Sequence, residues 1–241
     1  MTQPSEPTPR MIREWAACGI VAAVSRFVPV PLLDDVVKER ATRLALARTL
    51  KEHEREYDVT ELEVLYTGTA GWFAGVRKYM VGVPARVVLF PVRKYVAIFS
   101  SVKDVPADVM GVILLARTLH RSLDRGELST RDEQALRREA WRLRKAYDTA
   151  FEEMDLRLLT GALTDALSTG RGLSGAAADA AQRLIGRLNA RGDEASDLVG
   201  RAEPELIEGA DEVRQVLKRP EISALIEDFD HRVDAYLGIA S

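Results

Sequence analysis

The sequence has little of what would mark an exported or disulfide-stabilised protein. Its 241 residues include one cysteine, Cys18, which excludes an internal disulfide and is typical of the reducing cytosol. Small residues before Cys18 loosely resemble a lipoprotein cleavage site. A signal peptide would also need an apolar stretch before that point, whereas residues 1–14 are polar and proline-rich. We therefore expect a cytoplasmic protein.

The chain also lacks an uninterrupted run of about 20 apolar residues, the length that a membrane-spanning helix needs. Its two most apolar stretches, residues 15–33 and 79–101, are interrupted by arginines and prolines. Each charge at the centre of a span would cost about 2.5–3.5 kcal/mol. A spanning helix is therefore not expected, although segments of this kind can lie on a membrane surface.

Strand-forming residues are scarce as well. Aromatic residues make up 6% of the chain, runs of β-branched residues are few, and Ala, Leu, Arg and Glu dominate. These are strong helix formers, so we predict an all-α multi-helix bundle. We expect a disordered tail over residues 1–10, an apolar helical core region over 11–126 and a charged helical region over 130–241. Packing of the two helical regions into one domain is an alternative to separate units.

Several residues predict where helices begin and end. The pairs Thr60–Glu63 and Thr130–Glu133 have the spacing of a capping box, so we expect helices to begin at both threonines. An apolar helix before Gly126 is expected to end there, because glycine is favoured just after a helix C-terminus.

The charged region is predicted to contain one long helix followed by three shorter ones over residues 176–189, 204–218 and 220–237. From Asp193 onward the chain has thirteen acidic residues against five basic ones. The long helix has apolar residues at steps of three and four, typical of a narrow packing seam within the chain or with a second copy. This seam consists of Leu136, Ala140, Leu143, Tyr147, Ala150, Met154 and Leu158.

The middle of the chain has no acid at all over forty residues, 64–103, which we call the basic aromatic segment. It contains six basic and seven aromatic residues, and the sequence VRKY occurs in it twice. Basic residues attract anionic lipid headgroups, and aromatic side chains suit the membrane interface. We expect a membrane or partner contact through Trp72, Phe73, Arg77, Lys78, Tyr79, Arg86, Phe90, Arg93, Lys94 and Tyr95.

A second interpretation places the basic aromatic segment in the core, with its cations paired to the acidic C-terminal helices. We expect no nucleic-acid partner, because the apolar content is too high for a site that binds mainly phosphate. Residues 84–101 are predicted to be helical, with two short strands as the alternative.

No motif predicts a catalytic group, a cofactor or a metal site. Residues 170–175 match G-x-G-x-x-G, but a dinucleotide site needs a preceding strand where this sequence predicts helix. We expect a loop there, with Ser174 capping the next helix. The histidines His53, His120 and His231 are scattered among charged residues, without the spacing of metal ligands, and are expected at the surface.

Residues 102–123, VKDVPADVMGVILLARTLHRSL, and the glycine-rich stretch YTGTAGWFAGV at 66–76 resemble the EcsC family of bacterial helical proteins. The resemblance covers residues 64–125. It ends at LDRGEL, where the family has a Tyr-Gly-hydrophobic-Asp sequence. It implies an all-helical, membrane-associated cytoplasmic protein without an established catalytic centre, and it supplies no functional residues.

These observations favour a non-catalytic binding or scaffold protein at the inner face of the cell membrane. Anionic lipid would meet the basic aromatic segment, and a protein partner would meet the charged C-terminal helices. A soluble protein-interaction module is the first alternative. A helical enzyme whose site is assembled from distant residues is the second, and homo-oligomerisation stays open.

Overall fold

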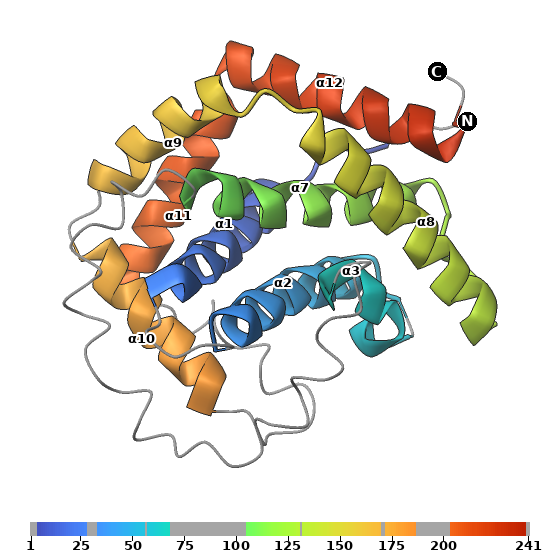
Figure 1. The fold of residues 1–241 in the computed structure, drawn as a ribbon, viewed down its shortest axis with the longest axis horizontal. Coiled ribbons are helices and arrows are strands. Elements are labelled where there is room, and N and C mark those ends of the chain that lie inside the picture. The colour runs from blue at the N-terminus through green and yellow to red at the C-terminus, as the bar shows by residue number, and fades with distance from the viewer. Residues whose placement is uncertain are drawn as a thin grey trace.

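The computed structural model describes residues 4–27, 33–55, 57–67, 105–130, 132–169, 172–186 and 203–239. Over these ranges it contains nine α-helices and two short 3-10 helices, and no strand (Figure 1). The all-α prediction is confirmed. The α-helices are α1 (Pro9–Val24), α2 (Leu33–Glu52), α3 (Glu63–Thr67), α7 (Val105–Asp124), α8 (Glu133–Glu152), α9 (Arg157–Thr169), α10 (Leu173–Gly186), α11 (Pro204–Leu217) and α12 (Pro220–Leu237).

Helix α1 lies at the centre of the molecule, where α2, α7, α10 and α11 pack around it (Figure 1). Twelve of its sixteen residues are buried, because its sequence is apolar on every side from Trp15 to Val24. Small residues let neighbouring helices approach closely. At Gly19, a Cβ atom would lie 2.7 Å from the carbonyl oxygen of Val109 in α7, so only glycine fits this crossing without a shift.

Helices of the two predicted regions pack on each other. Helix α1 contacts α10 and α11, and α7 contacts α8, α9 and α12. Helix α8 packs against α12, so a partner of this charged helix comes from the same chain (Figure 1). Its buried seam includes Leu136, Leu143 and Tyr147, as predicted.

The prediction of one long helix that continues through Leu158 is wrong. Helix α8 ends at Glu152, and α9 begins at Arg157 after a short turn. The side chain of Asp155 accepts a hydrogen bond from the backbone N–H of Arg157, a local contact that competes with helix continuation. Leu158 is consequently 54% exposed instead of belonging to the seam.

Two helix starts also differ from the predicted capping boxes. Asp58, and not Thr60, caps the 3-10 helix Val59–Leu62 that leads into α3. Asp132, and not Thr130, caps α8 by accepting from two backbone N–H groups. In both cases a carboxylate lies close to the threonine, and a carboxylate is a strong acceptor at the positive end of a helix. Ser174 lies inside the first turn of α10 and is not its cap.

The N-terminal residues were expected to form a tail through residue 10. Instead Pro9 and Arg10 already belong to α1, and the Thr8 side chain caps that helix. Ser5 and Glu6 make hydrogen bonds to α7.

The basic aromatic segment lies almost entirely outside the described residues, since the chain between 68 and 104 is not described. All ten contact residues predicted in it, and the choice between helix and strands over 84–101, fall in this gap. Of its seven aromatic residues the structure places Tyr66, which is half-buried. Over the described ranges, no helix is both long and apolar enough to cross a membrane.

Candidate functional site

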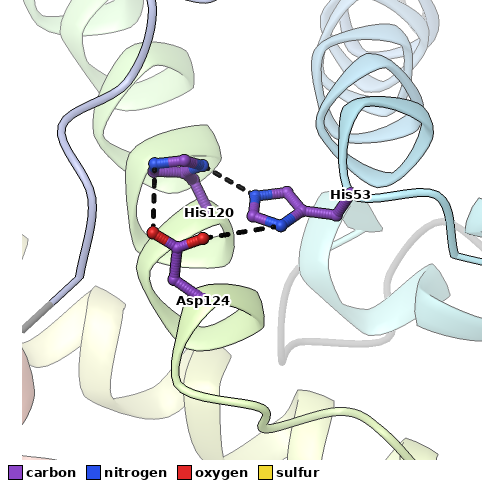
Figure 2. Close-up of side chains that lie close together, drawn as sticks. All are labelled: His53, His120 and Asp124. Carbon is purple, nitrogen blue, oxygen red and sulfur yellow. Dashed lines mark hydrogen bonds and ion pairs between the residues drawn. The ribbon is translucent and has the colours of Figure 1, made fainter. Parts of the chain in front are cut away.

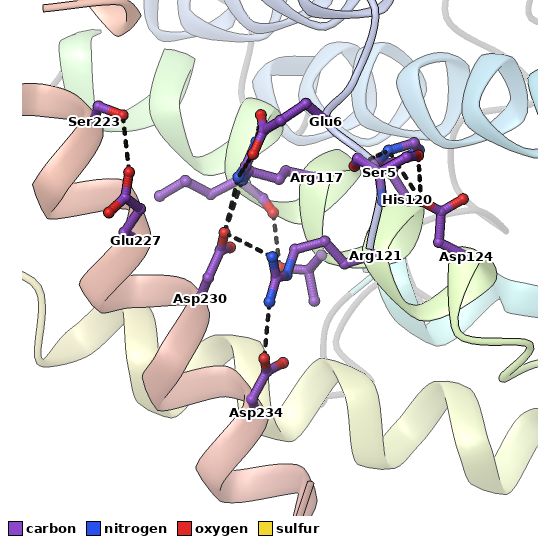
Figure 3. Close-up of polar contacts among 12 residues, drawn as sticks. Ser5, Glu6, Arg117, His120, Arg121, Asp124, Ser223, Glu227, Asp230 and Asp234 are labelled. Carbon is purple, nitrogen blue, oxygen red and sulfur yellow. Dashed lines mark hydrogen bonds and ion pairs between the residues drawn. The ribbon is translucent and has the colours of Figure 1, made fainter. Parts of the chain in front are cut away.

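The C-terminal half of α7 carries polar side chains in the interior of the fold. Positions three and four residues apart lie on one face of a helix, so this sequence presents two polar faces. His120 and Asp124 face the end of α2, whereas Arg117 and Arg121 face α12 (Figure 3). Arg125, which directly follows α7, donates a hydrogen bond to Asp234 of α12 as well.

On the first face, His53, His120 and Asp124 form what we call the histidine cluster (Figure 2). His53 directly follows α2, and its Nε2 atom lies 2.7 Å from Nδ1 of His120, within hydrogen-bond distance. The other nitrogen of each ring faces the carboxylate: His53 Nδ1 and His120 Nε2 each lie 3.7 Å from an oxygen of Asp124. The three side chains therefore form a closed ring of polar contacts.

The histidine cluster is largely screened from water. His120 is 4% exposed, and its ring packs against the indole of Trp15 with 6.0 Å between ring centroids. Trp15 is itself held by a 2.9 Å hydrogen bond from its Nε1 to the hydroxyl of Thr49 in α2. His53 is partly buried. The expectation that these histidines lie at the surface is wrong for His120, because helices α1 and α2 cover it.

Ser5 covers the open side of the histidine cluster. Its backbone N–H donates to Asp124 Oδ2 over 2.6 Å, and its hydroxyl donates to the same oxygen. Its carbonyl oxygen lies 3.1 Å from His120 Nε2 and accepts when that nitrogen carries a hydrogen. The N-terminal segment is thereby tied to α7 (Figure 3).

The surroundings set the charge of the cluster. Burial alone would raise the pKa of Asp124, but the hydrogen bonds from Ser5 and the two histidines hold that pKa below its usual range. Partial burial, followed by the neighbouring His120, lowers the pKa of His53. At neutral pH, Asp124 is therefore an anion and His53 is mainly neutral.

The second face of α7 forms the arginine–aspartate network, defined as Arg117, Arg121, Arg125, Asp230 and Asp234. Its ion pairs range from 2.6 Å for Arg125–Asp234 to 3.3 Å for Arg121–Asp230. Each of the five side chains is at most 17% exposed. Burial raises the pKa of Asp230, and Arg117 and Arg121 oppose this rise. The network fastens α12 to α7.

The described residues do not arrange a nucleophile for catalysis. Cys18 is buried in the core, and burial raises the pKa of its thiol to about 12, so the reactive thiolate is scarce at neutral pH. Ser5 donates its hydroxyl directly to a carboxylate, while His120 contacts its carbonyl oxygen. A Ser-His-Asp triad instead requires the histidine to accept the serine proton. Two imidazoles beside a carboxylate are better suited to binding a cation.

Sequence reasoning did not find the histidine cluster. The spacing of His120 and Asp124, which are one helical turn apart, could have indicated that these two side chains lie together. His53 is 67 residues away and is brought close only by the packing of α2 on α7. At residues 170–175, the preceding element is helix α9, as expected, so the strand that a dinucleotide site needs is not there.

A scan against family models, a search of curated proteins and a search of solved structures found no match to this chain. The resemblance to the EcsC family therefore stays a hypothesis based on residues 64–125.

Proposed function

We propose that this protein is a peripheral, membrane-associated helical binding or scaffold protein of the cytoplasm, and that its basic aromatic segment contacts anionic lipid. The observation that carries the proposal is the composition of that segment, with six basic residues, seven aromatic residues and no acid over forty positions. Each base near an anionic surface contributes about 1 kcal/mol. Aromatic side chains suit the interface, where one end meets apolar chains and the other meets water.

The ion pairs of the C-terminal helices give a second argument. Asp230 and Asp234 pair with arginines of α7, and Asp228 pairs with Arg232 of its own helix over 2.7 Å. These acids are already engaged within the described part of the fold. These three acids are therefore not available to neutralise the bases of the segment.

Co-sedimentation with vesicles tests the proposal. We expect the purified chain to sediment with vesicles rich in phosphatidylserine at low salt, and not with vesicles of phosphatidylcholine alone. Reversal of Arg77, Lys78, Arg93 and Lys94 to Glu should abolish binding. Loss of four attractions of about 1 kcal/mol each weakens partitioning about 1,000-fold, even before repulsion is added. Binding should also weaken with rising salt.

The matched control reverses four exposed bases elsewhere to Glu: Lys51, Arg137, Arg138 and Arg157. It changes the net charge by the same amount, so it separates a local contact from attraction by the whole protein. Retained binding by the control variant supports the segment as the contact. A wild-type protein that ignores anionic vesicles at low salt would overturn the proposal and favour a soluble interaction module.

A further inference from the structure

The proposed membrane contact does not use the histidine cluster, whose three residues lie outside positions 64–103 of the sequence. One nitrogen from each imidazole and one carboxylate oxygen lie within 4.8 Å of one another. Imidazole and carboxylate are the nitrogen and oxygen ligands that zinc takes in proteins. The side chains come from two separate helical elements, so the arrangement depends on the fold.

The positions of these residues suit metal binding. His120 and Asp124 are four residues apart on α7, the spacing by which a helix directs two ligands to one point. His53 approaches from the end of α2 and supplies a third donor. Three protein ligands with a fourth position left for water are a common zinc arrangement.

Contacts around the cluster resemble the outer shell of a metal site. A metal-binding histidine usually donates its other N–H to a carbonyl or a carboxylate, which fixes the ring. His120 Nε2 faces the Ser5 carbonyl, so its Nδ1 points toward His53. The backbone N–H and hydroxyl of Ser5 orient the carboxylate of Asp124.

A count of hydrogens shows why the cluster favours an extra positive charge. Two contacts are at hydrogen-bond distance: the one between the rings at 2.7 Å, and His120 Nε2 to the Ser5 carbonyl at 3.1 Å. Two neutral imidazoles supply both hydrogens with their two N–H groups. His53 Nδ1 then has no hydrogen and faces the Asp124 carboxylate across 3.7 Å, so a cation beside this carboxylate is attracted by both groups.

We propose that His53, His120 and Asp124 form a binding site for a divalent transition metal ion of the zinc class. The ion binds between the two rings and the carboxylate. Ring nitrogens that bind the same tetrahedral ion are separated by about 3.3 Å. The ligand atoms of the three side chains now lie within 4.8 Å of one another, so the side chains must move closer to bind one ion, and the partly buried His53 ring is the one with room to turn.

Isothermal titration of the metal-stripped full chain with Zn²⁺ tests the site. We expect one equivalent to bind per chain. His53→Gln and His120→Gln should each weaken binding by more than about 100-fold, because each removes a ligand. Ser5→Ala removes an outer hydrogen bond to Asp124 and should weaken binding by about 10-fold. Binding of Co²⁺ should give the visible absorption of a tetrahedral site.

His231→Gln is the matched control, because His231 is an exposed histidine on α12, away from the cluster. Its affinity for Zn²⁺ should equal that of the wild type. Circular dichroism checks each variant for folding, and the His53 variant decides the question if the His120 variant does not fold. The proposal is overturned if the wild type shows no saturable Zn²⁺ binding at micromolar concentration. Undiminished binding by folded His53→Gln would overturn it equally.

Discussion

Gly19 of α1 and Val109 of α7 lie so close that the Val109 carbonyl oxygen is 2.7 Å from the position of a Cβ on residue 19. Gly19→Ala should therefore force the two central helices apart. We expect the free energy of unfolding to fall by about 1–3 kcal/mol, as for other overpacked cores. Urea denaturation followed by circular dichroism measures this change.

Gly161 of α9 provides the opposite case, since a Cβ there meets nothing within 4 Å. Gly161→Ala should raise the free energy of unfolding by about 0.5–1 kcal/mol, because alanine is the better helix former. If both variants had the same effect, the close crossing of α1 and α7 would not be a constraint on residue 19.

Removal of one acid from the arginine–aspartate network should be costly. Asp234→Ala leaves Arg121 and the 8% exposed side chain of Arg125 without this partner. We expect a loss of about 3 kcal/mol, because a buried charge is left uncompensated. The exposed pair of Arg137 and Glu133 is the comparison. Arg137→Ala should change stability by less than about 0.5 kcal/mol, and a similar loss in both variants would contradict the prediction.

Asp58 should make stability depend on pH. The backbone hydrogen bond from Thr60, followed by smaller contributions, lowers the pKa of Asp58 in the folded state. The folded state therefore binds the proton less tightly than the unfolded chain does. The stabilisation is present above the unfolded pKa of about 3.9 and is lost as the pH falls through the lower folded pKa.

The test compares the wild type with Asp58→Asn, which keeps an acceptor but does not titrate. The difference in unfolding free energy should be constant above about pH 5 and should shrink below about pH 4. Urea titrations at several pH values provide the measurement. A difference that stays constant down to pH 2 would show that Asp58 does not act as a titrating cap.

The thiol of Cys18 should not react with thiol reagents in the folded protein. Its side chain is buried in α1, and burial raises the pKa of its thiol to about 12. Ellman's reagent should therefore react with one thiol per chain in denaturant and with almost none under native conditions. Rapid native labelling would mean that α1 is more accessible than its packing indicates.

Local sequence signals predicted much of the fold. Helices α11 and α12 begin at Pro204 and Pro220 as expected, because proline fits the first turn of a helix. Gly126 ends the α7 segment with a positive φ of 80°, as glycine allows. Where two acceptors compete, the signal is ambiguous, and at Asp132 the carboxylate caps the helix instead of the threonine.

Contacts between residues far apart in the sequence could not be predicted from these local signals. The pairing of His53 with His120 depends on how α2 packs against α7, which no local pattern encodes. Burial of His120 is set by Trp15 of a third helix. The contacts predicted for the basic aromatic segment stay predictions, because its residues from 68 to 103 lie outside the described part of the chain.

Arg117 joins the two ends of the described chain, because it contacts Glu6 near the N-terminus and Asp230 in the last helix. A proteolytic cut or a bulky fusion that displaced residues 5 and 6 would free this guanidinium from one of its two carboxylates. It would also remove the Ser5 hydrogen bonds from Asp124, one turn from Arg121. Changes at the N-terminus should thus affect how α12 is held, so tags on this protein are better placed elsewhere.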